Sequence, residues 1–437
     1  MSRPEYLVDV ARFIRSKLIV DATLLTATSG IDRIVAVAQA VFVARILGAH
    51  DFGIYGFLVT TVGFIASLVG LQLGLTGTVF VARYRRTRPF EAGATVYLAE
   101  RTAWAMCITF VIVVGLGFDE IESHLFAHET GHGWAIAMGA LLVITSVISG
   151  VQEGVVQGFE DFRSTVNARL VAMFVTLLAV FPLTLQFGVE GAMGAVLIGA
   201  VSKYFVLERV KLKHLVREGI VVAQGGVRIG DLLFGFALPS MLISLLVGVV
   251  TWTGAYLVTR NVEGFVGAAF VAIAMQWRTP IILAGSALGA VLVPGVSGGV
   301  GASTGQMPVD THGKALALMA VASGLVAISI VGCSAWIAGW YGVDAAMLEA
   351  TFTIVVLAAV PTALANVALG RMVGEGRQWT VLALHVPYAV VTLWATMSLV
   401  PAAGPVGYAL AQALGAALLL GAALGWIAMP GRRPDTK

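Results

Sequence analysis

The chain has 437 residues, of which 58% are hydrophobic and only 12% are charged, and its mean hydropathy is +0.92. Soluble domains carry roughly 25% charged residues, so this composition excludes a soluble enzyme or binding domain and predicts an integral membrane protein. The net charge of +3 is too small to indicate nucleic-acid binding. No cofactor motif is evident, and we expect none to be bound.

The N-terminus predicts a short helix on the membrane surface. Apolar residues from Tyr6 to Ile14 recur at helical spacing opposite Arg12 and Arg15, which indicates an amphipathic helix over residues 4–17. No short apolar region ending at a small-residue cleavage site follows, so we expect no cleaved signal peptide.

Apolar runs long enough to cross a membrane follow along the whole chain. A span needs about 20 mainly apolar residues. Twelve such runs are present, at roughly 20–44, 54–79, 93–117, 133–156, 166–187, 191–210, 231–256, 264–288, 315–339, 346–370, 379–399 and 406–428. We therefore predict an all-α polytopic membrane protein with about twelve transmembrane helices.

Positive charge alternates between the loops and predicts the orientation. Short cytoplasmic loops carry an excess of Lys and Arg. Here these residues gather at the N-terminus, in every second loop and at the C-terminus, whereas the loop with Asp119, Glu120 and Glu122 is acidic. Both termini are therefore expected in the cytoplasm, in a multi-pass protein of the cell membrane.

The two halves of the chain resemble each other at a nearly constant offset. The stretch Gly191 to Leu197 and the stretch Gly404 to Leu410 open the sixth and twelfth spans, 213 residues apart. An even number of spans per half gives a parallel repeat, whose substrate site lies between the halves near the midplane. We expect an N-terminal bundle over 1–215 and a C-terminal bundle over 216–437, each with six spans.

Two arginines near the middle of apolar spans are the strongest candidates for a binding site. Arg33 lies in the first span, and Arg278 lies in the eighth span beside Gln276. A buried guanidinium is costly, so it normally faces a partner or a water-filled cavity. A structural salt bridge of Arg33 with Asp32 or Glu153 is the alternative.

Other polar residues near the ends of spans are weaker candidates. Arg45 and Arg260 lie at the outer ends of their spans, where pairing with Asp51 and Glu263 at the membrane surface is as plausible as substrate contact. A second set lies towards the cytoplasmic ends of spans four and ten and contains Glu153, Gln157 and Asn366. The Glu153 carboxylate could carry a coupling ion or balance the charge of an arginine, and we favour the second role.

Motifs typical of enzymes occur only in unsuitable places. His128 to His132 fits the zinc-protease pattern H-E-x-x-H, but it lies in a short loop weakened by glycine. Gly295 to Gly299 fits G-x-S-x-G without the strand-to-helix turn that such a nucleophile needs. The P-loop pattern is missing from the sequence. We expect neither catalysis nor a metal site.

Several stretches resemble the polysaccharide and oligosaccharide-lipid flippases of the multidrug/oligosaccharidyl-lipid/polysaccharide exporter (MOP) superfamily. The stretch from Arg45 to Tyr55 is similar to their first-loop signature, and Val266 to Ser297 is similar to their eighth span and its exit. Val155 to Phe159 and Asn366 to Arg377 resemble the ends of their fourth and tenth spans. The resemblance covers nearly the whole chain through the order of degenerate motifs.

The resemblance implies two six-helix bundles that form a V around a central cavity. It also implies transport of a polyprenyl-diphosphate-linked glycan from the cytoplasmic to the outer leaflet, with Arg33 and Arg278 holding the diphosphate or acidic sugars. The lipid II flippases of the superfamily have fourteen spans, so the count of twelve disfavours that branch. The expected partners are the lipid-linked glycan, membrane lipids and glycosyltransferases or a glycan polymerase, and we expect a monomer.

The sequence is also compatible with other functions. A drug/cation antiporter of the same superfamily is the close alternative, although arginines at the midplane disfavour cationic drugs. A membrane glycan polymerase or ligase would need a large external loop with catalytic residues, which the sequence lacks. The major facilitator superfamily fits poorly, because Val81 replaces the Asp and Tyr84 the second Gly of its loop signature.

Overall fold

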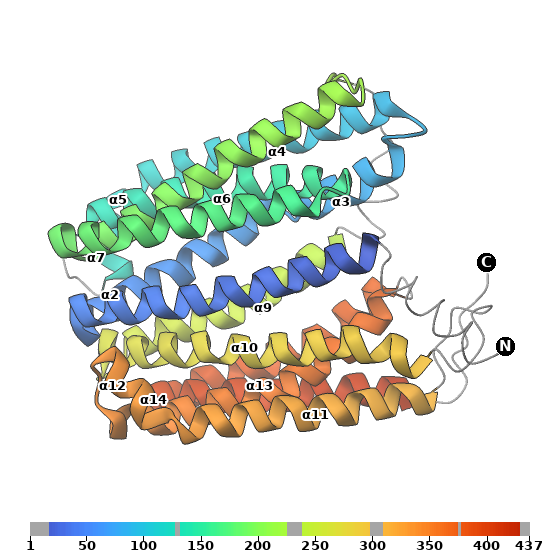
Figure 1. The fold of residues 1–437 in the computed structure, drawn as a ribbon. Coiled ribbons are helices and arrows are strands. Elements are labelled where there is room, and N and C mark those ends of the chain that lie inside the picture. The colour runs from blue at the N-terminus through green and yellow to red at the C-terminus, as the bar shows by residue number, and fades with distance from the viewer. Residues whose placement is uncertain (1–16, 127–131, 225–237, 298–308, 375–376, 429–437) are drawn as a thin grey trace.

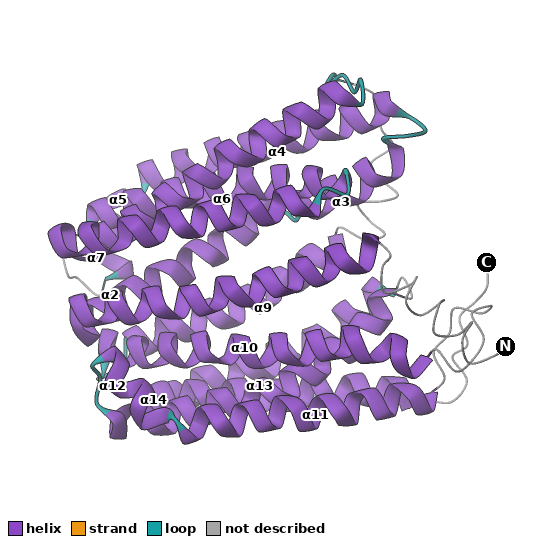
Figure 2. Ribbon diagram, in the orientation of Figure 1, coloured by secondary structure: helices purple, strands orange, loops and turns teal. Residues whose placement is uncertain are grey.

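A computed structural model describes residues 17–126, 132–224, 238–297, 309–374 and 377–428. Its regular structure, in these residues, is entirely α-helical (Figure 2). The expected surface helix over 4–17 and the histidine motif from His128 lie outside the described residues or at their edge, and the G-x-S-x-G stretch is described only up to Ser297, where a helix ends. The all-α class is confirmed.

Two sets of helices follow one another along the chain. The first, called here the N-terminal group, contains α2 (Lys17–Gly70), α3 (Leu73–Tyr84), α4 (Pro89–Leu116), α5 (Phe118–Leu125), α6 (Gly133–Gly158) and α7 (Phe162–Arg217). The second, the C-terminal group, contains α9 (Leu238–Thr259), α10 (Gly264–Ser297), α11 (Val309–Gly332), α12 (Ser334–Tyr341), α13 (Ala345–Gly374) and α14 (Gln378–Ala428).

Three of the longest helices are bent at glycines. The backbone leaves the helical region at Gly48 in α2, at Gly188 in α7 and at Gly404 in α14, each time with a positive φ. These positions fall between the predicted spans one and two, five and six, and eleven and twelve. Among the described residues, eight helices are long and apolar enough to cross a membrane, and three of these eight are the bent ones.

The bends correct the register of the internal repeat. Gly188 and Gly404 have matching backbone angles, with φ of 59° and 51° and ψ of −131° and −130°. Three residues later, a Cβ on Gly191 would lie 1.9 Å from the Leu183 carbonyl oxygen, and one on Gly407 would lie 2.2 Å from that of Leu399. These equivalent positions are 216 residues apart, so the predicted pairing of Gly191 with Gly404 at 213 is wrong by three residues.

The two groups meet along α2, which contacts both. In Figure 1 the N-terminal group lies above the C-terminal group, and the first part of α2 (dark blue) runs beside α10 (yellow). Helix α2 also packs on α7 and α9. A buried cluster joins Ala40 and Ala44 of α2 to Ala269 and Ile273 of α10. The groups diverge in the view toward the end at which α2 begins.

Large apolar side chains on the outside of the bundle match a lipid environment. Leu116 is 86% exposed, Trp134 75% and Trp394 68%. Water would penalise so many exposed apolar groups, whereas lipid chains would not. The protein is therefore a membrane-embedded helical protein.

Candidate functional site

A cavity of about 540 Å³ lies between the two groups. Thr60, Phe64 and Ser67 of α2 line one side, and α9 lines the other with Ser244, Thr251 and Trp252. Asn366 of α13 and His385 of α14 complete the wall. The volume falls in the range of about 300–1,000 Å³ that is usual for ligand sites, and the lining mixes apolar surface with a few polar groups.

Short contacts between α2 and α9 border this cavity. The Trp252 indole N–H donates to the Thr61 hydroxyl at 3.1 Å, and the Phe64 and Trp252 rings stack with centroids 5.6 Å apart. The Gln72 amide donates to the Ser244 hydroxyl at 2.9 Å. The groups can thus separate here by breaking neutral hydrogen bonds and a ring stack, without exposing a buried ion pair.

Arg278 does not line this cavity but is linked to its C-terminal side through Thr362. Its Nη2 donates to the Thr362 hydroxyl at 2.9 Å, and Thr362 is one helical turn before the cavity residue Asn366. Its Nη1 lies 3.5 Å from the Met275 sulfur, and its buried Nε has no hydrogen-bond partner. Within the described residues, every hydrogen-bond partner of this half-buried guanidinium is uncharged. Its positive charge is therefore available to an anionic group.

Arg33 lies at nearly the same height as Arg278. The Gln276 amide of α10 donates to the Ala36 carbonyl oxygen of the antiparallel α2 at 2.7 Å. Arg33 is three residues before Ala36, and Arg278 is two residues after Gln276. At a rise of 1.5 Å per residue, their α-carbons differ by only about 1.5 Å along the helix axes.

The face of α2 that carries Arg33 is the face that packs on α10. Arg33 precedes Ala36, Ala40 and Ala44 by three, seven and eleven residues, which places all four on one side of the helix. Ala40 and Ala44 are buried against α10, whereas Arg33 is exposed. Arg33 thus continues this face beyond the point where the two helices pack closely.

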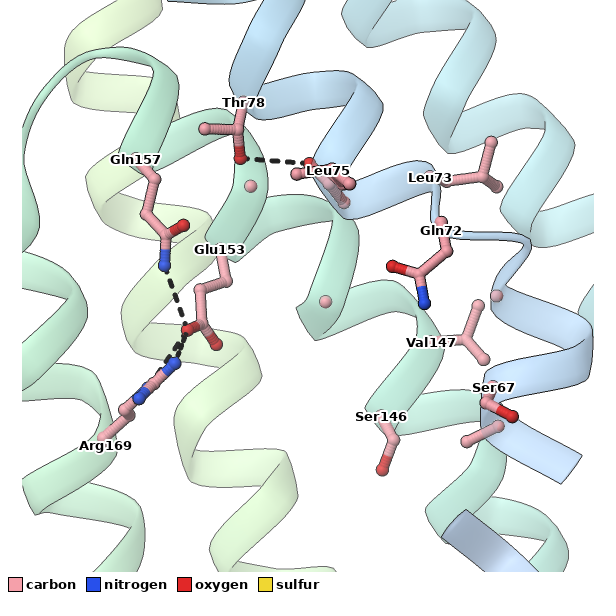
Figure 3. Close-up of a pocket in the computed structure, with 15 residues that line it drawn as sticks. Ser67, Gln72, Leu73, Leu75, Thr78, Ser146, Val147, Glu153, Gln157 and Arg169 are labelled. Atoms are coloured by element: carbon pink, nitrogen blue, oxygen red, sulfur yellow. Dashed lines mark hydrogen bonds and ion pairs between the residues drawn. The ribbon is translucent and has the colours of Figure 1, made fainter. Parts of the chain in front are cut away.

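A second cavity, of about 380 Å³, lies within the N-terminal group (Figure 3). Its lining includes Glu153 and Gln157, which the sequence predicted, and Arg169. The Glu153 carboxylate accepts hydrogen bonds from Arg169 Nε at 3.0 Å and from the Gln157 amide at 3.2 Å. The Nζ of Lys203 on α7 lies 2.5 Å from the Oε2 of Glu153. Glu153 thus balances Arg169 and Lys203 rather than Arg33.

Charge from α2 reaches the same cluster. Asp32 interacts electrostatically with Arg169, Lys203 and Glu153 as well as with its neighbour Arg33. Ser67 lines both cavities and so connects this charged region to the space between the groups. The residues that line the two cavities extend from Arg169 on α7 to His385 on α14.

The remaining predicted residues lie where the two groups touch. Gln276 joins α2 to α12, because it also accepts a hydrogen bond from the Tyr341 hydroxyl at 3.1 Å. Arg45 donates from Nε to the Trp340 carbonyl oxygen at 2.7 Å, and Arg260 donates to the His124 carbonyl oxygen. The expected partners Asp51 and Glu263 are therefore replaced by backbone carbonyls of the opposite group.

Several residues that line the cavities or pair with a lining residue escaped prediction. His385 and Lys203 are ionisable groups inside predicted spans, and the rarity of such groups in lipid could have drawn attention to both. Thr60, Ser67 and Thr251 gave no such signal, because hydroxyls in apolar helices commonly bond their own backbone, as Thr60 does to Gly56. In the described part of the chain, no cluster of three or more His, Cys, Asp or Glu residues could hold a metal ion.

Comparison with known proteins supplies a family and a fold. A family described as polysaccharide biosynthesis proteins matches residues 18–299. A search of curated proteins finds no match to the chain. Solved structures, by contrast, match over nearly its whole length.

Three solved structures illustrate the likeness. The lipid II flippase MurJ in an inward closed conformation has a TM-score of 0.71 at 12% identity, covering 93% of this chain and 87% of that one. An inward-facing multidrug resistance MATE transporter of the MOP superfamily has a TM-score of 0.69 at 16% identity, covering 92% and 97%. An outward-facing MATE structure scores 0.59 at 17% identity, covering 93% of each chain.

The family match spans well over half of the chain, and the arrangement of helices is that of MOP-superfamily transporters. The resemblance seen in the sequence is thereby confirmed. The chain belongs to the polysaccharide biosynthesis protein family.

Proposed function

We propose that the protein is a flippase that moves a polyprenyl-diphosphate-linked oligosaccharide or polysaccharide repeat unit from the cytoplasmic to the outer leaflet. In this proposal the chain crosses the cell membrane twelve times with both termini in the cytoplasm. Two six-helix bundles, over 1–215 and 216–437, rock about the cavity between them. Glycosyltransferases that assemble the glycan, or a polymerase that uses it, would act with the protein.

The observation that carries this proposal is the uncompensated charge of Arg278. An arginine cannot lose its proton, and its planar fork fits phosphate oxygens with two parallel hydrogen bonds. Thr362 and Met275 leave the charge of Arg278 unneutralised. A diphosphate entering the cavity of about 540 Å³ would supply the missing anion. The cavity hydroxyls, Asn366 and His385 provide donors and acceptors for sugar.

The conformation supports alternating access. The ends of the groups near α5 and α12 are joined by hydrogen bonds of Arg45 and Arg260, while the groups diverge toward the other end (Figure 1). Asp119 and Glu120 lie in the first turn of α5, and short loops without an excess of Lys and Arg are expected on the outer side of the membrane. We therefore assign the α5 and α12 end to the outer surface, in agreement with the loop charges.

The drug/cation antiporter remains the alternative, since MATE transporters share the fold. A cation exchanger needs a carboxylate that is free to bind and release its cargo. Glu153 already holds Arg169 and Lys203, which disfavours this role. Asp32 interacts electrostatically with the same two cations, Arg169 and Lys203, which likewise disfavours a role in binding a cationic cargo. A polymerase or ligase lacks support from any of these observations.

Two cargoes distinguish these functions. The purified protein is reconstituted in liposomes that contain a fluorescent polyprenyl-diphosphate oligosaccharide, and movement between leaflets is followed with a membrane-impermeant quencher. Parallel liposomes are tested for export of a cationic dye against a proton or sodium gradient. We expect movement of the glycan lipid and no dye export. Dye export without movement of the glycan lipid would overturn the proposal in favour of an antiporter.

A further inference from the structure

Two arginines hold the two groups together at the end that carries α5 and α12. Arg45 lies three residues before the bend of α2 at Gly48, and its Nε and Nη2 donate to the Trp340 and Gly339 carbonyl oxygens of α12. Arg260 follows the last residue of α9 and donates to the His124 carbonyl oxygen of α5. Each arginine therefore reaches from its own group to the other.

The two contacts correspond in the internal repeat to within one residue. Arg45 and Arg260 are 215 residues apart, and their acceptors His124 and Trp340 are 216 residues apart. Helices α5 and α12, which carry the acceptors, each have eight residues and are offset by 216. Arg45 of the N-terminal group thus binds α12 of the C-terminal group, and Arg260 of the C-terminal group binds α5 of the N-terminal group.

Both arginines bind carbonyls that a helix cannot satisfy itself. The last four carbonyl oxygens of an α-helix have no partner within the helix, and the negative end of the helix dipole lies there. His124 belongs to the last turn of α5, and Gly339 and Trp340 belong to the last turn of α12. A guanidinium supplies N–H donors and the complementary charge there, although the Gly339 carbonyl oxygen also accepts a hydrogen bond from the Gly342 N–H at 3.3 Å.

The contacts beneath the arginines can separate without leaving a buried charge behind. A Cβ on Gly53 would lie 1.8 Å from the Phe265 carbonyl oxygen, so the backbones of α2 and α10 touch there. The Phe265 ring also contacts His50, with ring centroids 5.6 Å apart. Phe52 contacts Tyr341 of α12 at 6.0 Å. Arg45 and Arg260 are exposed, and their hydrogen bonds can pass to water when the groups part.

We propose that Arg45 and Arg260 form a reciprocal clasp that closes the outer side of the protein and must open for the outward-facing state. Because the clasp couples each bundle to a short helix of the other, rotation of one bundle breaks both contacts together. The inference rests on the alternating access of the proposed function, but it concerns the gate and not the cargo.

A distance measurement across the gate tests the clasp. Trp134→Cys and Met347→Cys place spin labels on the first turns of α6 and α13, at side chains 75% and 65% exposed. Cys107 and Cys333 are first replaced by Ala and Ser, because both are free thiols. Electron–electron double resonance in lipid nanodiscs then gives the populations with short and long distances between the labels.

The clasp predicts a graded opening. Loss of one hydrogen-bonded contact changes an equilibrium by about fivefold, so Arg45→Ala and Arg260→Ala should each raise the ratio of long to short distances by about fivefold. The double variant should raise it by about 25-fold. Arg45→Lys should have an intermediate effect, because one ammonium replaces two N–H donors that serve two carbonyls.

Arg101→Ala is the matched control. Arg101 is an exposed arginine whose Nη1 donates to the Tyr97 hydroxyl of its own helix at 2.6 Å, so its loss should leave the distances unchanged. Distances in the Arg45→Ala, Arg260→Ala double variant equal to those of the parent would overturn the clasp, as would an equal shift in Arg101→Ala. Glycan movement by the same preparations is scored separately, so failure of the flippase proposal would be seen independently of the gate.

Discussion

Gly188 and Gly404 adopt the same left-handed backbone conformation at equivalent places, 216 residues apart. Each interrupts a long helix and turns it into an antiparallel pair. The equivalence extends to Gly199 and Gly415, where a Cβ would lie 1.9 Å from the Thr176 hydroxyl and 2.2 Å from the Thr392 hydroxyl. A matched pair of helical hairpins thus occupies the same place in each half of the chain.

Alanine at either bend should destabilise the protein. The combination of φ near 55° and ψ near −130° strains any residue with a Cβ, at a cost of about 1–3 kcal/mol. Gly188→Ala and Gly404→Ala should therefore each lower the apparent Tm in detergent. Gly421→Ala is the control, because it lies inside α14 with nothing within 4 Å of a Cβ. Equal melting of Gly188→Ala and Gly421→Ala would show that the bend is not strained.

Removing the charge of Glu153 alone should lower the stability of the protein more than removing it together with the charge of Lys203. Glu153→Gln leaves Arg169 and Lys203 close together without their carboxylate, and breaking such a buried pair costs about 3–5 kcal/mol. Adding Lys203→Met should restore part of the loss, because one uncompensated cation is removed. Denaturation in mixed detergent micelles measures both free energies of unfolding. A double variant less stable than Glu153→Gln would contradict the assignment.

Asp161 should contribute to stability only above acidic pH. Burial raises the pKa of this carboxyl, but hydrogen bonds from Ser164 at 3.0 and 2.7 Å and from His214 at 2.8 Å outweigh the burial and hold the pKa below its ordinary value. The folded state therefore favours the charged form. The stabilisation is present above the unfolded pKa of about 3.9 and is lost as pH falls through the lower pKa of the folded state.

Melting curves of wild type and Asp161→Asn between pH 7 and pH 3 check this dependence. The difference in Tm should be largest near neutral pH and should shrink as the carboxyl of the wild type becomes protonated. A difference that stays constant across this range would mean that the charge of Asp161 does not matter.

The sequence predicted the helical fold well because lipid imposes long apolar runs. The predicted ends of spans five and six, at 187 and 191, bracket the bend at Gly188. The repeat was misaligned by three residues because Gly191 and Gly404 begin similar strings. Only backbone angles reveal that Gly188 is the partner of Gly404. Glycine-rich sequences offer several registers, and packing selects one.

The site was harder to predict than the fold. Arg278 was proposed as a site residue because a cation in an apolar span is costly, and its role in binding stays a prediction. The partners of Arg45 and Arg260 are 295 and 136 residues away and are backbone carbonyls, which any residue could supply. Asp51 and Glu263 were expected instead because they are near in sequence. Contacts of this kind depend on how the two groups pack against each other, and the local sequence around each arginine does not predict that packing.

The flipping rate of Arg278→Ala tests the central claim most directly. In liposomes with a fluorescent polyprenyl-diphosphate oligosaccharide, we predict that wild type and Arg101→Ala move the lipid at equal rates. Arg278→Ala should be at least about tenfold slower, since a charge-assisted hydrogen bond to phosphate contributes about 1.5–3 kcal/mol. Arg278→Lys should fall between them. Equal rates for wild type and Arg278→Ala would contradict the account.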